Sequence, residues 1–419
     1  MTKKKEAQAG RKSCPFNPGY LKLLLASHGM RVEERIAGEI EQTLKTRRGV
    51  SGGVELILPG DVWVNVPTEE EFAHASPLCL TKEGERFFLT GYGDRLEVSL
   101  LPQPDFYEKV TSRGTPYYQI AVLHGGEVHI TPTSRCSFFE LNANCVFCHE
   151  REKFLPIARE FITVEEVVEI VEAAFEDNLA DSVELNIGYY DSEDRGILHL
   201  EPYIKAIKRN FDTLVSVDVQ PPAASRWIDR TYAMGADKIS YHMEIFNKEI
   251  FKKLCPGKEK EIGWERFAEA LNYAAGIFPS GTVSSNLIVG LEPAESTIQG
   301  IDYLTTMGIM PILPIFRPLK GTPLHDTPVP EVDDMAPIFG HLYNAVKKSK
   351  MNMSWSKSVS THLTPLESRF FAGEDARLQV VMQNIYKTKV GGKAVRGYTG
   401  LRRRLKVKEV EDSFESSGL

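Results

Sequence analysis

Hydrophobic and polar positions follow two different patterns in the first third of the chain. Residues 16–48 carry apolar residues at intervals of three and four, which predicts helices. The pattern then changes to short alternating runs broken by Gly and Pro, which predicts strands. Two adjacent glycines in the HGGE segment at 124–127 supply the positive φ angles that a tight hairpin turn needs. We therefore expect residues 1–120 to form an N-terminal α+β region.

From about residue 127, short apolar runs alternate with amphipathic runs. The strand candidates are residues 128–133, 183–188, 214–219, 237–242, 283–290 and 310–316. The amphipathic runs between the strands predict helices. Thr163 and Glu166 form a capping box at the start of the first predicted helix. Gly235 and Gly308 are placed to end two of the later helices. The strands are mostly continuous apolar runs, which is typical of strands buried on both faces.

This alternation predicts right-handed crossovers and a parallel sheet. About six strand–helix units fit either an open doubly wound sheet or an incomplete barrel, and the order alone does not choose between them. Both architectures place the active site at the carboxyl ends of the strands. We expect the main domain to span 121–350 and a C-terminal appendage to span 351–419. Its basic stretch at 387–408 is either a clamp for an acidic or phosphorylated substrate or a solvated tail.

Composition and charge narrow the class of protein. Hydrophobic residues make up 42% and charged residues 26%, as in an ordinary globular protein, and the net charge of -7 argues against a nucleic-acid partner. No stretch approaches the roughly 20 apolar residues that span a bilayer, and no apolar signal core follows the basic first residues. We expect a cytoplasmic protein whose thiols stay reduced, so clustered cysteines indicate metal binding in place of disulfides.

Three of the six cysteines lie close together after the strand at 128–133. Eight residues separate Cys136 from Cys145, and two separate Cys145 from Cys148. A structural zinc site needs a fourth ligand, which His149 could supply. A 4Fe–4S cluster on three cysteines instead leaves one iron open to a small molecule. Spacing alone leaves zinc and iron–sulfur both open, but the position at the carboxyl end of a strand favours a catalytic cluster.

The segment Cys145-Val146-Phe147-Cys148 resembles the end of the radical SAM motif, Cys-x-x-x-Cys-x-aromatic-Cys. The first gap here is eight residues instead of three, as in variants such as the iron-only hydrogenase cofactor maturase. The resemblance runs over about residues 127–325. It implies an α/β fold, a partial (β/α)6 TIM-type barrel, with the N-terminal α+β extension and the C-terminal appendage attached. It also implies a 4Fe–4S cluster on Cys136, Cys145 and Cys148, with S-adenosylmethionine (SAM) as the second cofactor.

The later strands carry weaker matches to the same family. Around Glu244 the chain resembles the biotin synthase and hydrogenase-maturase branch, in which an acid and an arginine about twenty residues later contact SAM. SAM carries an ammonium, a carboxylate and a ribose diol, which one acid and one arginine suit. By this resemblance, the expected SAM contacts are Phe147, Gly188, Glu244, Arg266, Asn286, Ile288, Gly290 and Arg317. Cys255 is interpreted as a buried small hydrophobe.

The resemblance implies an oxygen-sensitive enzyme that reductively cleaves SAM to a 5′-deoxyadenosyl radical, which acts on a small biosynthetic substrate. It also implies an electron donor of the flavodoxin or ferredoxin kind. Candidate substrate contacts at the strand ends are Tyr189, Asp218, Gln220 and His242. Two alternatives remain: a zinc-binding barrel that acts as a hydrolase or lyase, and a non-catalytic iron–sulfur or zinc scaffold. We expect the two flanking regions to close the barrel and shape its pocket.

Overall fold

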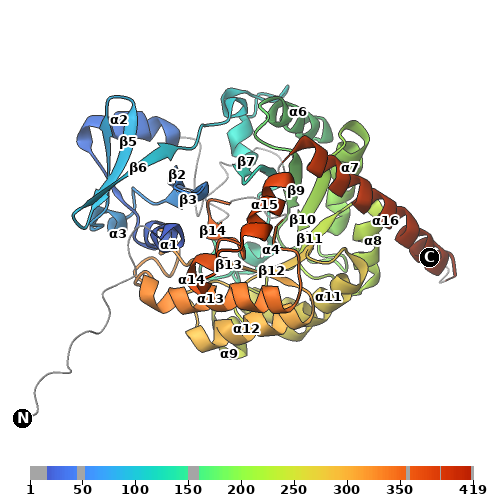
Figure 1. The fold of residues 1–419 in the computed structure, drawn as a ribbon. Coiled ribbons are helices and arrows are strands. Elements are labelled where there is room, and N and C mark those ends of the chain that lie inside the picture. The colour runs from blue at the N-terminus through green and yellow to red at the C-terminus, as the bar shows by residue number, and fades with distance from the viewer. Residues whose placement is uncertain (1–16, 45–51, 150–159, 355–358, 387, 417–419) are drawn as a thin grey trace, which may run out of the picture.

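A computed structural model describes residues 17–44, 52–149, 160–354, 359–386 and 388–416 of the chain. The basic first residues of the chain therefore lie outside the described residues. The described strands form two sheets, one of six strands from the N-terminal region and one of eight strands that begins at Ala121. Figure 1 shows the smaller sheet at one side of the larger unit. No helix in the described part of the chain is long and apolar enough to cross a membrane.

The smaller sheet is mainly antiparallel, with the strand order β1-β4-β5-β6-β2-β3. Its strands are β1 (Arg31–Val32), β2 (Val54–Leu58), β3 (Val62–Val66), β4 (Cys79–Glu83), β5 (Arg86–Gly91) and β6 (Asp94–Leu100). The accompanying helices are α1 (Pro18–His28), α2 (Glu34–Leu44) and α3 (Glu71–His74). Helix α1 packs against β3 and against a helix of the larger unit, so it is buried on most sides. The predicted α+β character of this region is confirmed.

The larger sheet holds six parallel strands in sequence order. They are β8 (Glu127–Ile130), β9 (Ser182–Asn186), β10 (Leu214–Asp218), β11 (Lys238–Ser240), β12 (Val283–Asn286) and β13 (Met310–Pro314). A doubly wound sheet would reverse its order at a switch point, whereas this order proceeds in one direction, as in a barrel. The prediction of a partial (β/α)6 barrel is confirmed.

Both edges of the parallel sheet carry an antiparallel strand. Strand β7 (Ala121–His124) pairs with β8 through the predicted hairpin, whose Gly125 and Gly126 both have positive φ. Strand β14 (His362–Leu363) pairs with β13 at the other edge. A segment of the C-terminal appendage is therefore part of the barrel sheet, which the sequence analysis did not predict.

The helices follow the predicted amphipathic runs. They are α6 (Val164–Glu176), α7 (Ile197–Asn210), α8 (Arg226–Met234), α9 (Lys248–Leu254), α10 (Pro256–Glu261), α11 (Trp264–Ile277), α12 (Ala294–Thr306) and α13 (Val332–Lys348). The capping box of α6 is present, since Thr163 N donates to Glu166 and Glu166 N donates to the Thr163 hydroxyl. Gly235 ends α8 and Gly308 follows α12, both with positive φ. These local predictions are confirmed.

The expectation that both faces of the barrel strands are apolar is wrong for the face that points into the barrel. In β9, Val183 and Leu185 are fully buried in the hydrophobic core, whereas Glu184 and Asn186 line a cavity inside the barrel. Strand β10 alternates in the same way, with Ser216 lining the cavity. Side chains alternate across a strand, so polar residues at every second position mark the face that borders the cavity.

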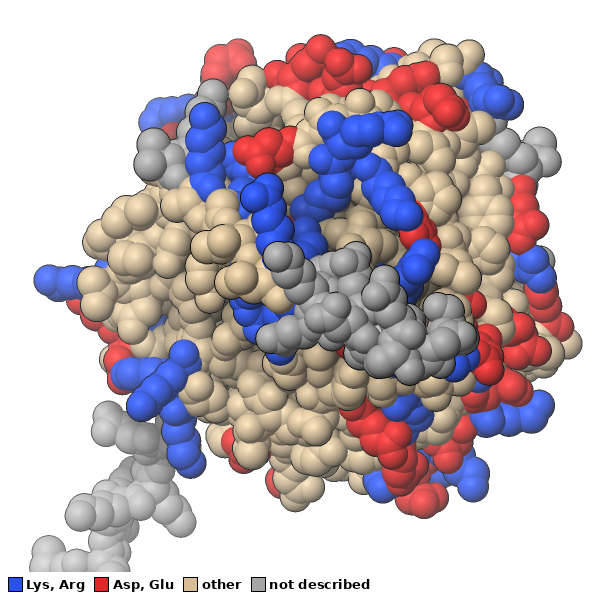
Figure 2. Space-filling view, turned by 90° about the vertical axis from the view of Figure 1, so that its right-hand side faces the viewer, with Lys and Arg blue, Asp and Glu red and all other residues tan. Residues whose placement is uncertain are grey.

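The basic part of the C-terminal appendage is a long helix that packs on the barrel. That helix is α16 (Lys389–Ser416), and α14 (Arg369–Ala372) and α15 (Arg377–Tyr386) precede it in the appendage. Figure 2 faces the side of the molecule where α16 lies and shows Lys and Arg side chains gathered there. The alternative of a solvated tail is wrong for the described part of this stretch.

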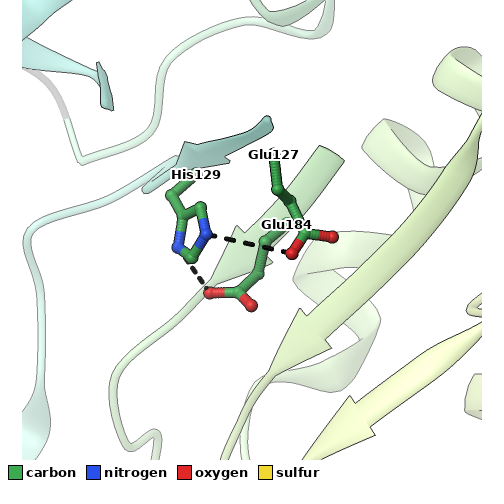
Figure 3. A group of neighbouring side chains, drawn as sticks. All are labelled: Glu127, His129 and Glu184. Atoms are coloured by element: carbon green, nitrogen blue, oxygen red, sulfur yellow. Dashed lines mark ion pairs between the residues drawn. The ribbon is translucent and has the colours of Figure 1, made fainter. Parts of the chain in front are cut away.

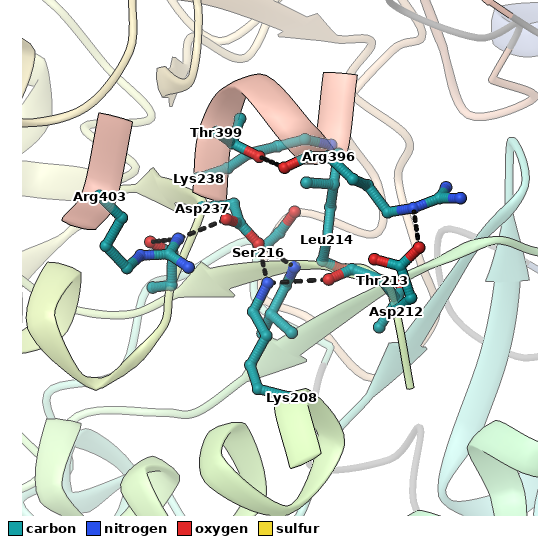
Figure 4. A network of polar contacts seen from close by, with 12 residues as sticks. Lys208, Asp212, Thr213, Leu214, Ser216, Asp237, Lys238, Arg396, Thr399 and Arg403 are labelled. Carbon is teal, nitrogen blue, oxygen red and sulfur yellow. Dashed lines mark hydrogen bonds and ion pairs between the residues drawn. The ribbon is translucent and has the colours of Figure 1, made fainter. Parts of the chain in front are cut away.

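Two ion pairs attach α16 to the starts of barrel strands. Arg396 pairs with Asp212 at 3.2 Å, and Arg403 pairs with Asp237 (Figure 4). Asp212 lies two residues before β10 and Asp237 immediately before β11, so α16 crosses the amino ends of these strands. Arg396 also lines the barrel cavity. Helix α16 thus lies at the end of the barrel opposite the predicted active site.

Candidate active site

The cysteine loop follows β8 and is held by hydrogen bonds to the segment after β9 and by a turn within the loop. Ser137 N donates to Tyr189 O at 2.8 Å, and Tyr189 N donates to Cys136 Sγ at 3.4 Å. Cys148 N donates to Cys145 O at 3.0 Å, which makes a tight turn between the last two cysteines. The loop is therefore held against the segment after β9, at the carboxyl ends of the strands.

Two glycines, Gly188 and Gly257, pack so closely against the cysteine loop that they determine its position. A Cβ atom at Gly188 would lie 2.6 Å from both Arg135 O and the Cβ of Cys136. A Cβ atom at Gly257 would lie 2.4 Å from Ala143 O. Real Cβ atoms essentially never come so close to backbone, so only glycine permits this packing. Gly188 is an expected SAM contact by the family resemblance, and in the structure it also packs against the Cys136 backbone.

The barrel encloses a cavity of about 620 Å³ that runs from the cysteine loop toward the amino ends of the strands. Cys136, Cys145 and Cys148 all line it. The other predicted site residues that line it are Phe147, Gly188, Asp218, Gln220, His242, Glu244, Asn286, Ile288 and Arg317. Tyr189, Arg266 and Gly290 are not among its lining residues. One cavity therefore brings together the three cysteines and most of the residues predicted from the later strands.

A buried ion pair lies beside the cysteines. Lys258 Nζ donates to His242 O at 2.7 Å and to Glu244 Oε1 at 3.2 Å, and the lysine is 4% exposed. Burial opposes the charged form of Lys258, but Glu244, Cys145 and Cys255 outweigh it and raise the lysine pKa. The ammonium therefore persists and offers a positive charge to nearby thiolates, which bind iron or zinc.

The cysteines differ in their surroundings. Burial raises the pKa of the Cys136 thiol. A hydrogen bond from Cys255 lowers the pKa of Cys145 against the effect of burial. Cys255 is fully buried and does not line the cavity, so it lies behind Cys145 and not beside the open space. Cys255 is buried, as predicted, but its contact with the Cys145 thiol was not predicted.

A polar network lies at the carboxyl ends of β9, β10 and β12. Asn186 Nδ2 donates to Asp218 Oδ2 at 2.8 Å, and His242 Nε2 lies 3.2 Å from the same oxygen. Asn286 N donates to His242 Nδ1 at 3.1 Å. Because Nδ1 accepts this bond, the ring carries its proton on Nε2, toward Asp218. The network fixes the imidazole orientation inside the cavity.

Tyr189 and Gln220 have different positions at the strand ends. Tyr189 is fully buried, and its ring stacks on Phe138 with centroids 4.1 Å apart. It therefore supports the cysteine loop from outside the cavity. Gln220 lines the cavity, and its buried Oε1 has no hydrogen-bond partner among the described residues. Of the two, only Gln220 is placed to touch a molecule in the cavity.

The structure assigns the two predicted arginines to other partners. Arg266 Nε donates to Pro222 O at 2.8 Å, while Glu244 pairs with Lys258. Arg317 donates to Ala26 O and to both the side chain and backbone oxygens of Asn65, at 2.6–3.0 Å. The guanidinium of Arg317 thus joins the barrel to the N-terminal region.

Gly290 is explained by packing within the protein. Its φ of 101° lies in the region that favours glycine, and a Cβ atom there would lie 2.9 Å from Pro330. The expected close approach of a ligand to its backbone is therefore not needed to account for this glycine.

Several polar residues deeper in the cavity were not predicted from the sequence. They are Glu127, His129, Glu184, Ser216 and Lys238, all on the inner face of the sheet. The available signal was the alternation of polar and apolar residues in Glu127–Ile130 and Ser182–Asn186. Such alternation indicates that one face of a strand borders a polar space.

No family model matches the chain. The bacteriochlorophyllide c C-7(1)-hydroxylase of Chlorobaculum limnaeum is 25% identical over 120 residues, which cover 28% of this chain and 30% of that protein. An uncharacterised protein of Methanocaldococcus jannaschii is 24% identical over 287 residues, which cover 65% of this chain and 71% of that protein. The match to the hydroxylase thus spans less than a third of its length.

Solved structures with a similar fold include three enzymes. Methylornithine synthase is 16% identical with a TM-score of 0.43, over 55% of this chain and 64% of that chain. The FeFe-hydrogenase maturase HydG from Carboxydothermus hydrogenoformans is 19% identical with a TM-score of 0.43, over 56% and 53%. A radical SAM methyltransferase from Sphaerobacter thermophilus is 15% identical with a TM-score of 0.40, over 66% and 76%.

Proposed function

We propose that this protein is a radical SAM enzyme that holds a 4Fe–4S cluster on Cys136, Cys145 and Cys148. The observation that carries the proposal is that, within the described part of the chain, three cysteines and no fourth line one cavity at the carboxyl ends of the barrel strands. Three thiolates leave one iron open to a small molecule, whereas a closed structural zinc site needs four ligands.

The residues around the cysteines fit such a cluster. The buried ammonium of Lys258 favours thiolates over thiols, and Phe147 adds an apolar side chain to the same wall of the cavity. When bound, the cluster and SAM together would supply one-electron cleavage of SAM to a 5′-deoxyadenosyl radical. Glu244, Asn286 and Ile288 line the cavity and are the residues that we propose to bind SAM.

The chain's own residues would then orient the reacting molecules and exclude water. Asp218 and His242 form a fixed hydrogen-bonded pair on the cavity wall, and Gln220 presents an amide oxygen beside them. We propose that these three residues contact a small-molecule substrate. A preorganised polar wall restricts the substrate to one orientation, which limits the side reactions of a radical.

We propose that the regions 1–120 and 351–419 close the barrel domain at 121–350. The hydrogen bonds of Arg317 to Asn65 support this role for the first region. His362 and Arg396 support it for the second, because both line the barrel cavity. We also propose a cytoplasmic location and a flavodoxin- or ferredoxin-like electron donor, since an oxygen-sensitive cluster needs a reducing compartment.

A zinc site remains the second candidate, because His149, the fourth ligand that the sequence offered, lines the same cavity, and Cys255 hydrogen-bonds to Cys145. Against this, His149 Nε2 lies 3.1 Å from Lys320 O, and Cys255 does not line the cavity that the other three cysteines share. A zinc protein would be colourless and would not cleave SAM.

The test is made without oxygen. The protein is reconstituted with iron and sulfide, reduced with dithionite and incubated with SAM, and 5′-deoxyadenosine is measured by mass spectrometry. We expect product from the wild type and none from Cys148→Ala. A colourless protein that binds zinc in place of iron and forms no product would refute the proposal.

A further inference from the structure

A second group of potential metal ligands lies inside the barrel, on the inner faces of β8 and β9. Glu127 and His129 come from β8 and Glu184 from β9, and Figure 3 shows the imidazole between the two carboxylates. One ligand atom from each residue lies within 4.8 Å of the other two. Two ligands about 2.1 Å from one ion are at most about 4.2 Å apart, so the 3.9 Å between His129 Nε2 and Glu127 Oε2 lets both atoms reach one ion.

The two nitrogens of His129 face different carboxylates. Nδ1 lies 2.8 Å from Glu184 Oε1, which is a hydrogen-bond distance, whereas Nε2 lies 3.9 Å from Glu127 Oε2. An ion between Nε2 and the Glu127 carboxylate would leave the contact at Nδ1 in place. A carboxylate on the second nitrogen is the usual arrangement for a histidine that binds a metal.

The Glu127 carboxylate is already held in one orientation. Ser216 Oγ donates to its Oε1 at 2.7 Å, and Lys238 Nζ lies 3.3 Å from the same oxygen. These two contacts orient the carboxylate so that Oε2 faces His129. Preorganised ligands of this kind lose little entropy when an ion binds.

The group is polar, partly accessible and charged. The exposed fractions of the side chains are 18% for Glu127, 18% for Glu184 and 28% for His129, and all three line the cavity. Lys238 and His129 hold the pKa of Glu127 at about 2 although burial opposes ionisation. A histidine binds a metal in its neutral form, and the two carboxylates then share one lysine charge, so a cation in the cavity would find a net negative site.

We propose that His129 Nε2 and the Glu127 carboxylate bind one divalent transition-metal ion inside the barrel, apart from the three cysteines, while Glu184 orients the imidazole through Nδ1. Imidazole together with carboxylate oxygen suits Mn²⁺, Fe²⁺ or Zn²⁺. The coordination positions that the protein does not fill face the cavity, so they are available to an oxygen atom of a substrate. The site goes beyond the proposed function and does not rest on it, since none of its ligands belongs to the cysteine loop.

Substitution of Lys238 distinguishes a metal site from a network of ion pairs that only stabilises the barrel. The Lys238 ammonium competes with a metal ion for the Glu127 carboxylate, because both are cations at the same group. Lys238→Met should therefore increase the affinity for metal. If the network only holds the barrel together, the same substitution should lower stability without creating any affinity for metal.

The probe is Mn²⁺, because thiolates bind this ion poorly and the cysteine loop will not compete for it. Free Mn²⁺ is followed by electron paramagnetic resonance during titration of the full chain, before and after cluster reconstitution. We expect one ion per chain, at least tenfold weaker binding in Glu184→Gln and at least threefold tighter binding in Lys238→Met. Glu97→Gln is the matched control, since that side chain is 56% exposed on β6.

The proposal is overturned if the wild type binds no Mn²⁺, or if Glu184→Gln binds it as tightly as the wild type. Should Glu184→Gln fail to fold, the wild type still decides the matter through its electron spin echo spectrum. Bound Mn²⁺ must show coupling to an imidazole nitrogen, and its absence refutes the assignment. Failure of cluster assembly is seen separately as missing iron, so it cannot be mistaken for failure of this site.

Discussion

Gly188→Ala tests whether packing behind Cys136 positions the cysteine loop. The substitution adds a single methyl group, which would lie 2.6 Å from Arg135 O and 2.6 Å from the Cβ of Cys136. Both contacts are with the loop itself and neither is with the end of a flexible side chain, so the loop must move. Gly188 does not have a φ in the left-handed region, so the effect is steric and not conformational.

The size of the effect follows from the cost of overpacking. Adding a methyl group to a tightly packed site typically costs about 1–3 kcal/mol. For a domain of this size each kcal/mol lowers the Tm by about 2–4 °C. We also expect displacement of Cys136 to reduce the iron content after reconstitution, because the three thiolates must reach one cluster.

The matched control is Gly276→Ala on α11, where an added Cβ atom meets nothing within 4 Å. Alanine favours a helix over glycine by about 1 kcal/mol, so this variant should keep its iron and melt at the same or a higher temperature. The assays are thermal unfolding and iron content per chain. Full iron content and an unchanged Tm in Gly188→Ala would refute the reasoning.

Three further predictions concern buried polar groups. Cys255→Ser should retain the iron content of the wild type, because Cys255 does not line the cavity; loss of bound metal in this variant would favour a four-cysteine zinc site. Lys258→Met leaves Glu244 as an uncompensated buried charge, so the free energy of unfolding, measured by chemical denaturation, should fall by about 3–5 kcal/mol, and the protein should retain less iron. A variant with the stability and iron content of the wild type would contradict this. Asp237→Asn removes the partner of Arg403, so limited proteolysis should cut α16 faster, and an unchanged cleavage rate would show that other contacts hold the helix.

Local sequence patterns determined much of the fold. The capping box at Thr163 and the glycines of the 124–127 hairpin depend on neighbours in the chain, and both occur as predicted. The strand and helix order depends on short periodic patterns, and it led to the partial barrel. The sequence positions of the three cysteines, after the first parallel strand, placed them at one end of the barrel because parallel strands share their carboxyl edge.

Tertiary structure decided the partners of the long side chains. Glu244 pairs with Lys258 instead of an arginine, and Arg317 reaches Asn65 in the N-terminal sheet. Sequence spacing gives no information on such contacts, because they join elements that are far apart in the chain. The fully buried contact of Cys255 with Cys145 has the same origin.

The polar interior of the barrel was also decided only by the folded chain. Glu127, His129 and Glu184 are separate polar residues in the sequence, and they meet only because β8 and β9 pair in register, with His129 opposite Glu184. The chain after residue 351 likewise has a weak local pattern, yet it supplies an edge strand and a helix that cover the barrel. Local periodicity determined which elements form, whereas the register and docking of those elements determined which side chains share a cavity.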